Sequence, residues 1–213
     1  MKKILFTLAL LISFVSFGQT AMEYFQSGYD KFKANDYSGA ISDYTKAIEL
    51  DHNYADAYFE RGYIRYLLGD EFDHAISDFT IFIELVPNNI ISTYIARAYY
   101  YRALSKFELD NRENASGAIA DLTKAIEFQP GYKDAYFHRG YIKEGLNDYT
   151  GSISDFTKAI EFSLFLDANL YYRRGLSKEQ FGDLSGACID WKKALELGDV
   201  FGEAAKKIAN QCK

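Results

Sequence analysis

The chain has 213 residues, an apolar fraction of 48% and a formal net charge of −6. This length and composition are typical of a folded protein with a sizeable core. The acidic balance argues against a nucleic-acid partner, because an excess of carboxylates repels a phosphate backbone.

The N-terminus has the order of an export signal. Lys2 and Lys3 precede an apolar run over residues 4–15, which is shorter than the ~20 residues of a membrane-spanning helix. Ser16 and Gly18 stand where a signal peptidase reads small residues, so the sequence predicts a signal peptide over residues 1–18 and cleavage before Gln19. A buried N-terminal helix is the alternative. The ending resembles bacterial export signals, so we expect a periplasmic or secreted protein with no transmembrane span after cleavage.

A unit of about 34 residues then recurs along the chain. The second halves of its five copies read Gly39-AISDYTKAIEL, His74-AISDFTIFIEL, Gly117-AIADLTKAIEF, Gly151-SISDFTKAIEF and Gly186-ACIDWKKALEL. Such a unit cannot bury its apolar face alone, so neighbouring units must stack. The expected repeats span residues 21–54, 55–89, 90–132, 133–167 and 168–201, with a cap helix over residues 202–213.

The recurring positions are mainly aromatic or small. Numbered with Tyr24 at position 4, the aromatics at that position are Tyr24, Tyr58, Tyr99, Tyr136 and Tyr171. The small residues at position 8 are Gly28, Gly62, Ala103, Gly140 and Gly175. Together with small residues at position 20 and mostly aromatic ones at position 24, this pattern resembles the tetratricopeptide repeat. The resemblance covers nearly all of residues 19–213. It implies an all-α fold, a right-handed superhelical solenoid of five helix pairs plus a C-terminal cap helix.

A short turn separates the two helices of most repeats. It contains Asn35-Asp36, Gly69-Asp70, Asn147-Asp148 and Gly182-Asp183. Gly or Asn can adopt the left-handed conformation that ends the first helix, and Asp can cap the second. The third repeat departs from this pattern: its first helix is expected to start near Ile90, and its turn is longer. Either change can mark a partner contact or be a tolerated irregularity.

Charged residues recur at two further positions. Position 23 is Asp in all five repeats, and position 7 is Arg in all but the first, which has Ser27. Since nothing precedes the first repeat, the missing Arg predicts that each Asp pairs with the Arg of the following repeat. Such pairs would fix the register between repeats. The alternative is that these Arg residues bind an anionic ligand.

Aromatic residues are also frequent at the first-helix positions that line the concave groove in the resembled family. The candidate partner-binding residues are Phe25, Tyr29, Phe59, Tyr63, Tyr66, Tyr100, Phe107, Phe137, Tyr141 and Tyr172. Aromatic side chains provide contact area at low entropic cost, which suits an extended peptide or a sugar chain. The alternative is that some of them pack within the superhelix.

These features predict a non-catalytic scaffold or adaptor that binds a protein or peptide through the groove, with a cell-envelope glycan-binding protein as the alternative. The basic clamp with which some family members hold a C-terminal carboxylate is absent from the first two repeats. The histidines lie at unrelated repeat positions and no nucleophile or phosphate-loop motif occurs, so we expect no enzyme activity, metal site or cofactor.

The two cysteines lie in the last repeat and the cap. Cys188 stands where the earlier repeats have Ile, so a small buried hydrophobe is one interpretation. If the last helix of repeat five and the cap helix run antiparallel, however, Cys188 lies opposite Cys212. The sequence then predicts a disulfide between Cys188 and Cys212. The cap helix also resembles the first helix of a further repeat, in which Ala209 would take the small position 8.

Overall fold

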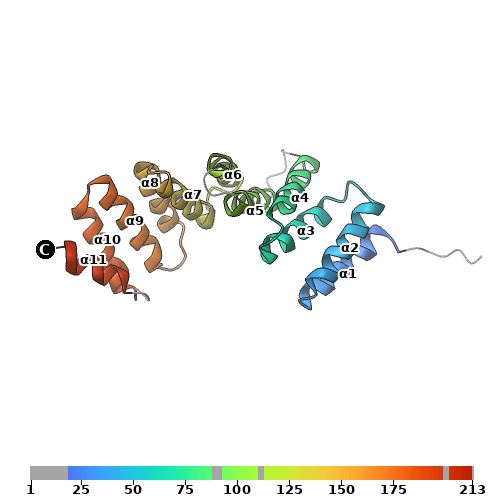
Figure 1. Cartoon of the computed structure of the whole chain (residues 1–213), viewed down its shortest axis with the longest axis horizontal. Coiled ribbons are helices and arrows are strands. Elements are labelled where there is room, and N and C mark those ends of the chain that lie inside the picture. The colour runs from blue at the N-terminus through green and yellow to red at the C-terminus, as the bar shows by residue number, and fades with distance from the viewer. Residues whose placement is uncertain (1–18, 88–92, 110–112, 199–201, 213) are drawn as a thin grey trace, which may run out of the picture. The chain divides into compact units, whose positions relative to one another are not determined.

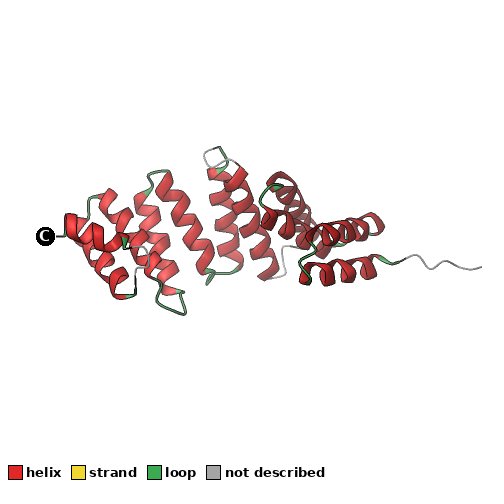
Figure 2. Cartoon of the chain, turned by 60° about the horizontal axis from the view of Figure 1, so that its bottom comes forward, coloured by secondary structure: helices red, strands yellow, loops and turns green. Residues whose placement is uncertain are grey.

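The computed structural model describes residues 19–87, 93–109, 113–198 and 202–212. The predicted signal peptide and the predicted helix start near Ile90 lie outside the described residues. Within them, the regular structure consists of eleven α-helices and no strand (Figure 2). The expected all-α class is therefore confirmed.

The chain divides into two compact units, with the division between His52 and Asn53. In the first, α1 (Ala21–Lys33) packs on α2 (Tyr37–Leu50). The second contains α3 (Ala55–Leu68), α4 (Phe72–Leu85), α5 (Thr93–Leu109), α6 (Ala115–Phe128), α7 (Lys133–Gly145), α8 (Tyr149–Glu161), α9 (Ala168–Phe181), α10 (Leu184–Glu196) and α11 (Glu203–Gln211). Each helix of the second unit packs on the next one in the chain (Figure 1). Sequential packing of helix pairs is the solenoid arrangement that the repeats predict.

The turns within the helix pairs follow the predicted chemistry in most repeats. Asn35 and Asn147 have φ of 62° and 63°, the left-handed conformation that ends a helix. The Asp148 carboxylate accepts a hydrogen bond from the Gly151 backbone N–H at 2.9 Å, and Asp36 and Asp183 make the same cap. The second repeat differs, because α4 begins one residue later and its N-cap, Glu71, makes no side-chain cap bond. Asp70 therefore does not cap α4.

The small residues at position 8 allow the two helices of a pair to approach closely. A Cβ atom on Gly175 would lie 2.4 Å from Nε1 of Trp191, whose side chain is fully buried. A Cβ atom on Gly28 would lie 2.9 Å from the Tyr44 ring. The large ring on the second helix thus fills the space that the absent side chain leaves, which gives the dense packing of a protein core.

The recurring aspartates pair within their own repeat, so the predicted pairing between repeats is wrong. Asp155 accepts hydrogen bonds from Arg139 Nη2 at 2.7 Å and from Lys143 Nζ at 2.8 Å, both on the preceding helix of the same pair. Asp78, Asp121 and Asp190 are held in the same way. Positions 7 and 11 lie one turn apart on the first helix, so both reach one carboxylate on the second.

The first repeat replaces the missing arginine with other donors. Asp43 accepts hydrogen bonds from the Ser27 hydroxyl and from Lys31, each at 2.6 Å. Burial alone would raise the pKa of the Asp43 carboxyl, but the hydrogen bonds from Lys31 and Ser27 and the charge of Lys31 outweigh it and lower that pKa. Asp43 therefore needs no arginine from another repeat.

A different polar contact links neighbouring repeats of the second unit. Arg139 donates through Nη1 to the Thr123 hydroxyl of the preceding repeat at 3.0 Å, and that hydroxyl donates to the Ile119 carbonyl at 2.8 Å. Arg102 with Thr80 and Arg174 with Thr157 repeat this arrangement at 3.1 and 3.2 Å. The arginine thus joins the aspartate of its own repeat to the threonine of the one before.

The C-terminal cap is tied to the last repeat by packing and by a disulfide. Helix α11 buries Ala204 beside Trp191, and Ile208 packs against the same cluster. Cys188 and Cys212 form a disulfide with a Cα–Cα distance of 5.7 Å. Ala209 is exposed, so it does not occupy the buried small position that the sequence suggested.

Candidate binding surface

Side chains from the first helices of successive repeats contact one another in residues 53–212. The ring of Tyr63 on α3 lies 4.9 Å from that of Tyr101 on α5, and the ring of Phe107 on α5 lies 6.1 Å from that of Tyr141 on α7. The guanidinium of Arg173 on α9 lies 4.7 Å from the Tyr141 ring. We call this surface the first-helix face; its residues are Tyr63, Tyr66, Tyr101, Phe107, Tyr141 and Arg173.

Two of the predicted groove residues are buried and belong to the core. The Phe59 side chain is enclosed by Phe79 and Phe82, with ring centroids 5.8 and 5.2 Å away. Tyr100 packs on Tyr132 at 5.0 Å. Burial is the main cause that raises the pKa of the Tyr100 hydroxyl far above its ordinary value. The prediction that Phe59 and Tyr100 face a partner is wrong, because neighbouring aromatic rings cover both side chains.

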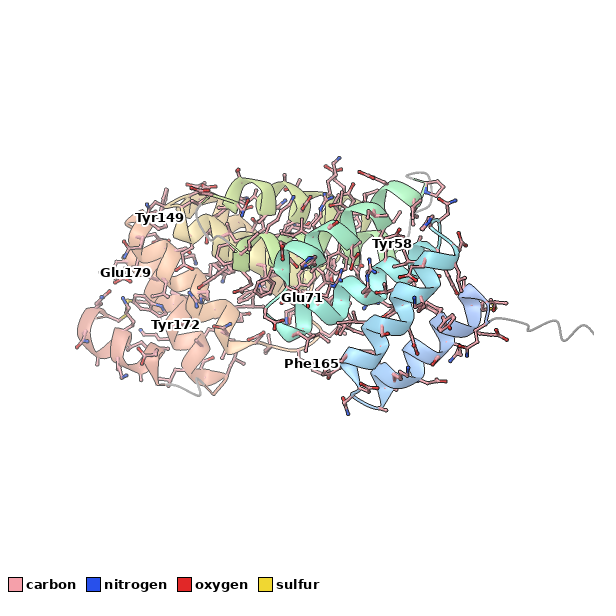
Figure 3. All side chains as sticks on the ribbon, turned by 45° about the vertical axis from the view of Figure 1, so that its right-hand side comes forward. Tyr58, Glu71, Tyr149, Phe165, Tyr172 and Glu179 are labelled. Carbon is pink, nitrogen blue, oxygen red and sulfur yellow. A yellow bond between two sulfur atoms is a disulfide. The ribbon has the colours of Figure 1, made fainter. Side chains whose placement is uncertain are left out.

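The other predicted residues, except Tyr141, are half-buried. Phe137 packs on Phe156 at 5.9 Å, and Tyr172 packs against the cluster around Trp191 (Figure 3). In the first unit, the Phe25 ring lies 5.4 Å from that of Tyr44, and Lys33 Nζ lies 4.7 Å from the centre of the Tyr29 ring. Among the predicted groove residues, only Tyr141 is classed as exposed, with 37% of its surface accessible.

A hollow of about 810 Å³ opens on the first-helix face between α5, α7 and α9. Phe107 and Tyr141 form an aromatic wall, and Leu146 and Tyr149 extend it at the end of α7 and the start of α8. Arg173 lies at the side that α9 contributes. The hollow thus combines an aromatic wall with polar side chains, and binding sites commonly combine apolar surface with a few placed polar groups.

The charged groups of this hollow, which Asn147 and Gln180 also line, are an arginine and a glutamate that lack good hydrogen bonds to each other. Arg173 Nη1 lies 3.6 Å from Glu144 Oε2, which is an ion pair but too long for a good hydrogen bond. Burial raises the pKa of the Glu144 carboxyl, and the nearby Arg173 only partly opposes this. Arg173 Nε and Glu144 Oε2 are buried and make no hydrogen bond to any described residue. Arg173 and Glu144 thus place a hydrogen-bond donor and an acceptor next to each other in the same hollow.

A similar combination recurs near the start of the second unit. The Arg97 guanidinium lies 5.1 Å from the Phe59 ring and 5.9 Å from the Tyr101 ring. Burial raises the pKa of the neighbouring Glu60 carboxyl, and the charge of Arg97 opposes that rise. Arginine over an aromatic ring beside a half-buried glutamate therefore occurs at two places on the first helices.

Sequence reasoning considered only the aromatic residues at positions 2, 5, 9 and 12. It therefore missed Tyr101 and Arg173 at position 6, and Arg97, which is at position 2 but is not aromatic. The run Tyr99-Tyr100-Tyr101 was an available signal, since three successive residues on a helix must point in three directions. It also missed an exposed apolar loop between α8 and α9, which contains Leu164 and Phe165.

No group of three or more His, Cys, Asp or Glu residues that could hold a metal ion occurs in the described parts of the chain. In those same parts, none of the helices has the length and apolar character needed to cross a membrane.

Comparison with known proteins points to one family of repeats. A family model described as TPR repeat matches residues 28–69, and one described as tetratricopeptide repeat matches residues 133–164. The chain is 36% identical over 106 residues to serine/threonine-protein phosphatase 5 of Rattus norvegicus and, at the same identity, to that of Homo sapiens. These matches cover 50% of the chain and only 19% of the phosphatase.

Solved structures share the fold over most of the chain. A crystal structure of the MamA protein is 26% identical, covers 89% of this chain and 93% of its own, and has a TM-score of 0.73. YrrB, described as a TPR protein with an unusual peptide-binding site, is 20% identical, with coverage of 87% and 90% and a TM-score of 0.73. MamA of Desulfovibrio magneticus RS-1 is 18% identical, with coverage of 84% and 96% and the same TM-score.

Proposed function

Because the chain is built of tetratricopeptide repeats, we propose that it is a non-catalytic scaffold that binds an extended segment of a partner protein along the first-helix face. The observation that carries this proposal is the hollow between Phe107, Tyr141 and Arg173. Its aromatic wall suits an apolar side chain of the partner, and its polar groups suit the main chain beside it.

Peptide groups match the polar part of the hollow. Each carries one N–H donor and one C=O acceptor, while Arg173 offers donors and Glu144 an acceptor. A small rotation of either side chain would exchange their 3.6 Å contact for two hydrogen bonds to one peptide group. The peptide-binding site ascribed to YrrB gives this use of the fold a parallel, although the identity to that chain is low.

The test uses a displayed library of random peptides and a panel of cell-envelope glycans, both screened against the full chain. We expect peptide ligands, and we expect the double substitution Tyr63→Ala with Tyr141→Ala to weaken their binding about ten-fold while the helical circular dichroism is retained. Phe181→Ala is the matched control, because its ring is exposed on α9 and does not line the hollow.

Two outcomes would contradict the proposal. Binding of glycans but not of peptides would favour the glycan-binding alternative. Unchanged peptide binding together with a collapsed melting temperature would show that Tyr63 and Tyr141 serve the core.

We also propose that the chain is exported, on the evidence of the basic, apolar and small-residue order before Gln19. The intact mass of the protein from its native host tests this. We expect a mature chain that begins at Gln19. A chain that retains Met1 would contradict the proposed export.

A further inference from the structure

The loop between α8 and α9 exposes an unusual amount of apolar surface. Leu164, Phe165 and Leu166 are consecutive and are 93%, 83% and 64% exposed. Phe165 is labelled in Figure 3. Within the loop, Ser163 donates a hydrogen bond from its hydroxyl to the Phe165 carbonyl. A loop that presents three large apolar side chains to water is typical of an interaction site.

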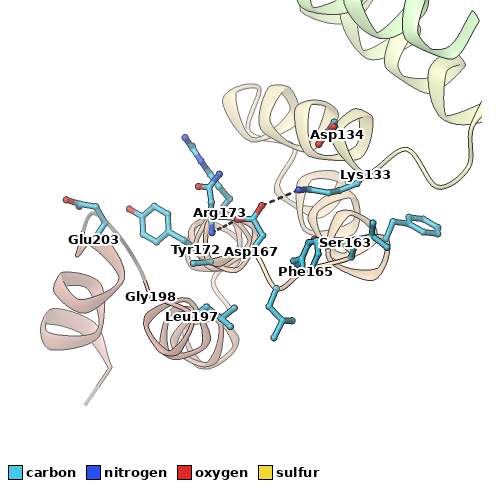
Figure 4. A pocket seen from close by; sticks show the side chains of 15 residues that line it. Lys133, Asp134, Ser163, Phe165, Asp167, Tyr172, Arg173, Leu197, Gly198 and Glu203 are labelled. Atoms are coloured by element: carbon cyan, nitrogen blue, oxygen red, sulfur yellow. Dashed lines mark hydrogen bonds and ion pairs between the residues drawn. The ribbon is translucent and has the colours of Figure 1, made fainter. Parts of the chain in front are cut away.

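A hollow of about 850 Å³ lies directly beside this loop. The start of α9 lines it with Asn169 and Tyr172, and Leu197 lines it from the end of α10 (Figure 4). The loop residues themselves form part of its wall. A protruding apolar element and a hollow that can accept one are therefore neighbours on the same surface.

We propose that two copies of the chain associate through this surface, with Leu164 and Phe165 of each copy entering the hollow of the other. A two-fold dimer requires a surface that complements itself, and a protrusion next to a hollow meets that requirement when one copy is rotated by half a turn. The surface is distinct from the hollow at Phe107 and Tyr141, although Arg173 lines both.

The charges at the rim fit a second copy. The rim carries Lys133 and Arg173 of one sign and Asp134, Asp167 and Glu203 of the other, and Lys133 pairs with Asp167 at 3.3 Å (Figure 4). A rim of a single sign would repel its own copy, whereas a mixed rim can place opposite charges face to face.

The apolar area comes close to what a specific interface requires. Exposed Leu and Phe side chains of this kind supply on the order of 400 Å² per copy, or roughly 800 Å² for the pair. The polar rim has to contribute about 200 Å² more to reach the ~1,000 Å² of a specific interface.

Sedimentation equilibrium of the full chain at micromolar concentrations tests the proposal. We expect a monomer–dimer equilibrium for the wild type and a dissociation constant at least about ten-fold higher for Phe165→Ser. Phe181→Ser is the matched control, because it removes an exposed phenylalanine from the other end of α9, and it should leave the equilibrium unchanged.

A mixing experiment tests the geometry itself. Asn169→Arg fills the hollow while the loop stays intact, and Asn169 is exposed, so the fold should tolerate it. Each variant alone should be monomeric, and a mixture of Phe165→Ser with Asn169→Arg should recover part of the dimer, because one intact loop then meets one intact hollow.

A monomeric wild type would overturn the proposal. Flotation of that monomer with phosphatidylcholine–phosphatidylglycerol vesicles would then assign the loop to a lipid surface, and absence of flotation would assign it to a different protein. A dimer that Phe165→Ser and Phe181→Ser affect equally, or no recovery on mixing of two folded variants, would also overturn it.

Discussion

Inside the helix pairs of residues 53–212, each buried aspartate is held by an arginine and a second cation of its own repeat, whereas the first-helix face of the same repeats changes from one repeat to the next. Position 6, which holds Tyr101 and Arg173 of this face, is Glu60 in the second repeat, Tyr101 in the third, His138 in the fourth and Arg173 in the fifth. The uniform interior therefore serves folding, and the varied face is free to serve recognition. Substitutions in the interior should lower stability, and substitutions on the face should mainly affect binding.

The largest effect is expected for Asp155→Ala. It leaves Arg139 and Lys143 largely buried without their carboxylate, which should lower the free energy of unfolding by about 3 kcal/mol. Urea unfolding measures this, with Ser154→Ala on the exposed side of α8 as the control. A loss below about 1 kcal/mol would contradict the claim that the interior aspartates serve folding, because these ion pairs would then contribute no more than surface pairs.

Removal of the disulfide should lower the free energy of unfolding by a similar amount, with the effect confined to the C-terminal end of the chain. Replacing both Cys188 and Cys212 by Ala opens a link with a sequence separation of 24, for which chain entropy predicts a loss of about 3 kcal/mol. Hydrogen exchange should show the loss concentrated in α11 and α10. Two free thiols in the unfolded, unreduced wild type would contradict the disulfide directly.

The next largest loss of stability is expected for Gly175→Ala. The added Cβ would lie 2.4 Å from the buried Trp191 ring, so the helices must separate, at a cost of about 2 kcal/mol. In Gly117→Ala the new Cβ has no neighbour closer than Lys106 Cδ at 3.7 Å, and this change should be neutral or stabilise by about 0.5 kcal/mol. Equal thermal shifts for the two variants would show that close approach is not the reason for glycine at position 8.

Thr123→Val tests the link between repeats. It keeps the shape of the side chain but removes the hydroxyl that accepts from Arg139, and should cost about 1 kcal/mol. Thr123→Ser retains the hydroxyl and should retain most of the stability. If the serine variant loses as much as the valine variant, packing of the methyl group is responsible.

The smallest effect is expected for Asp43→Asn, where Lys31 is 39% exposed and solvent weakens the pair, so the loss at neutral pH should be under about 1 kcal/mol. The folded pKa of Asp43 lies below the ordinary 3.8, so its charged form stabilises the fold above pH 3.8. That contribution disappears as the pH falls below 3.8 through the folded pKa. The stability difference between variant and wild type should therefore shrink in acid. A difference that does not change with pH would show that the charge of Asp43 is not its cause.

The sequence by itself determined the repeats, their helix pairs and the turns, because these depend on local chemistry that is repeated five times. Small residues at position 8 and Asn or Gly at the turn have one structural use each, so Gly175 and Asn147 could be interpreted without coordinates. The antiparallel geometry of two adjacent helices also brought Cys188 opposite Cys212 by counting alone.

Only the tertiary structure decided which residues meet across helices. Asp155 pairs with Arg139 of its own repeat. Phe59 is buried against Phe79 and Phe82, whereas Phe137, at the same repeat position, is only half-buried. With 3.6 residues per turn, a rotation of a few tens of degrees moves a position from groove to core, and a repeat pattern does not specify that angle. The exposure of Leu164 and Phe165 is likewise a tertiary result, because an apolar run in a sequence gives no sign of whether another element covers it.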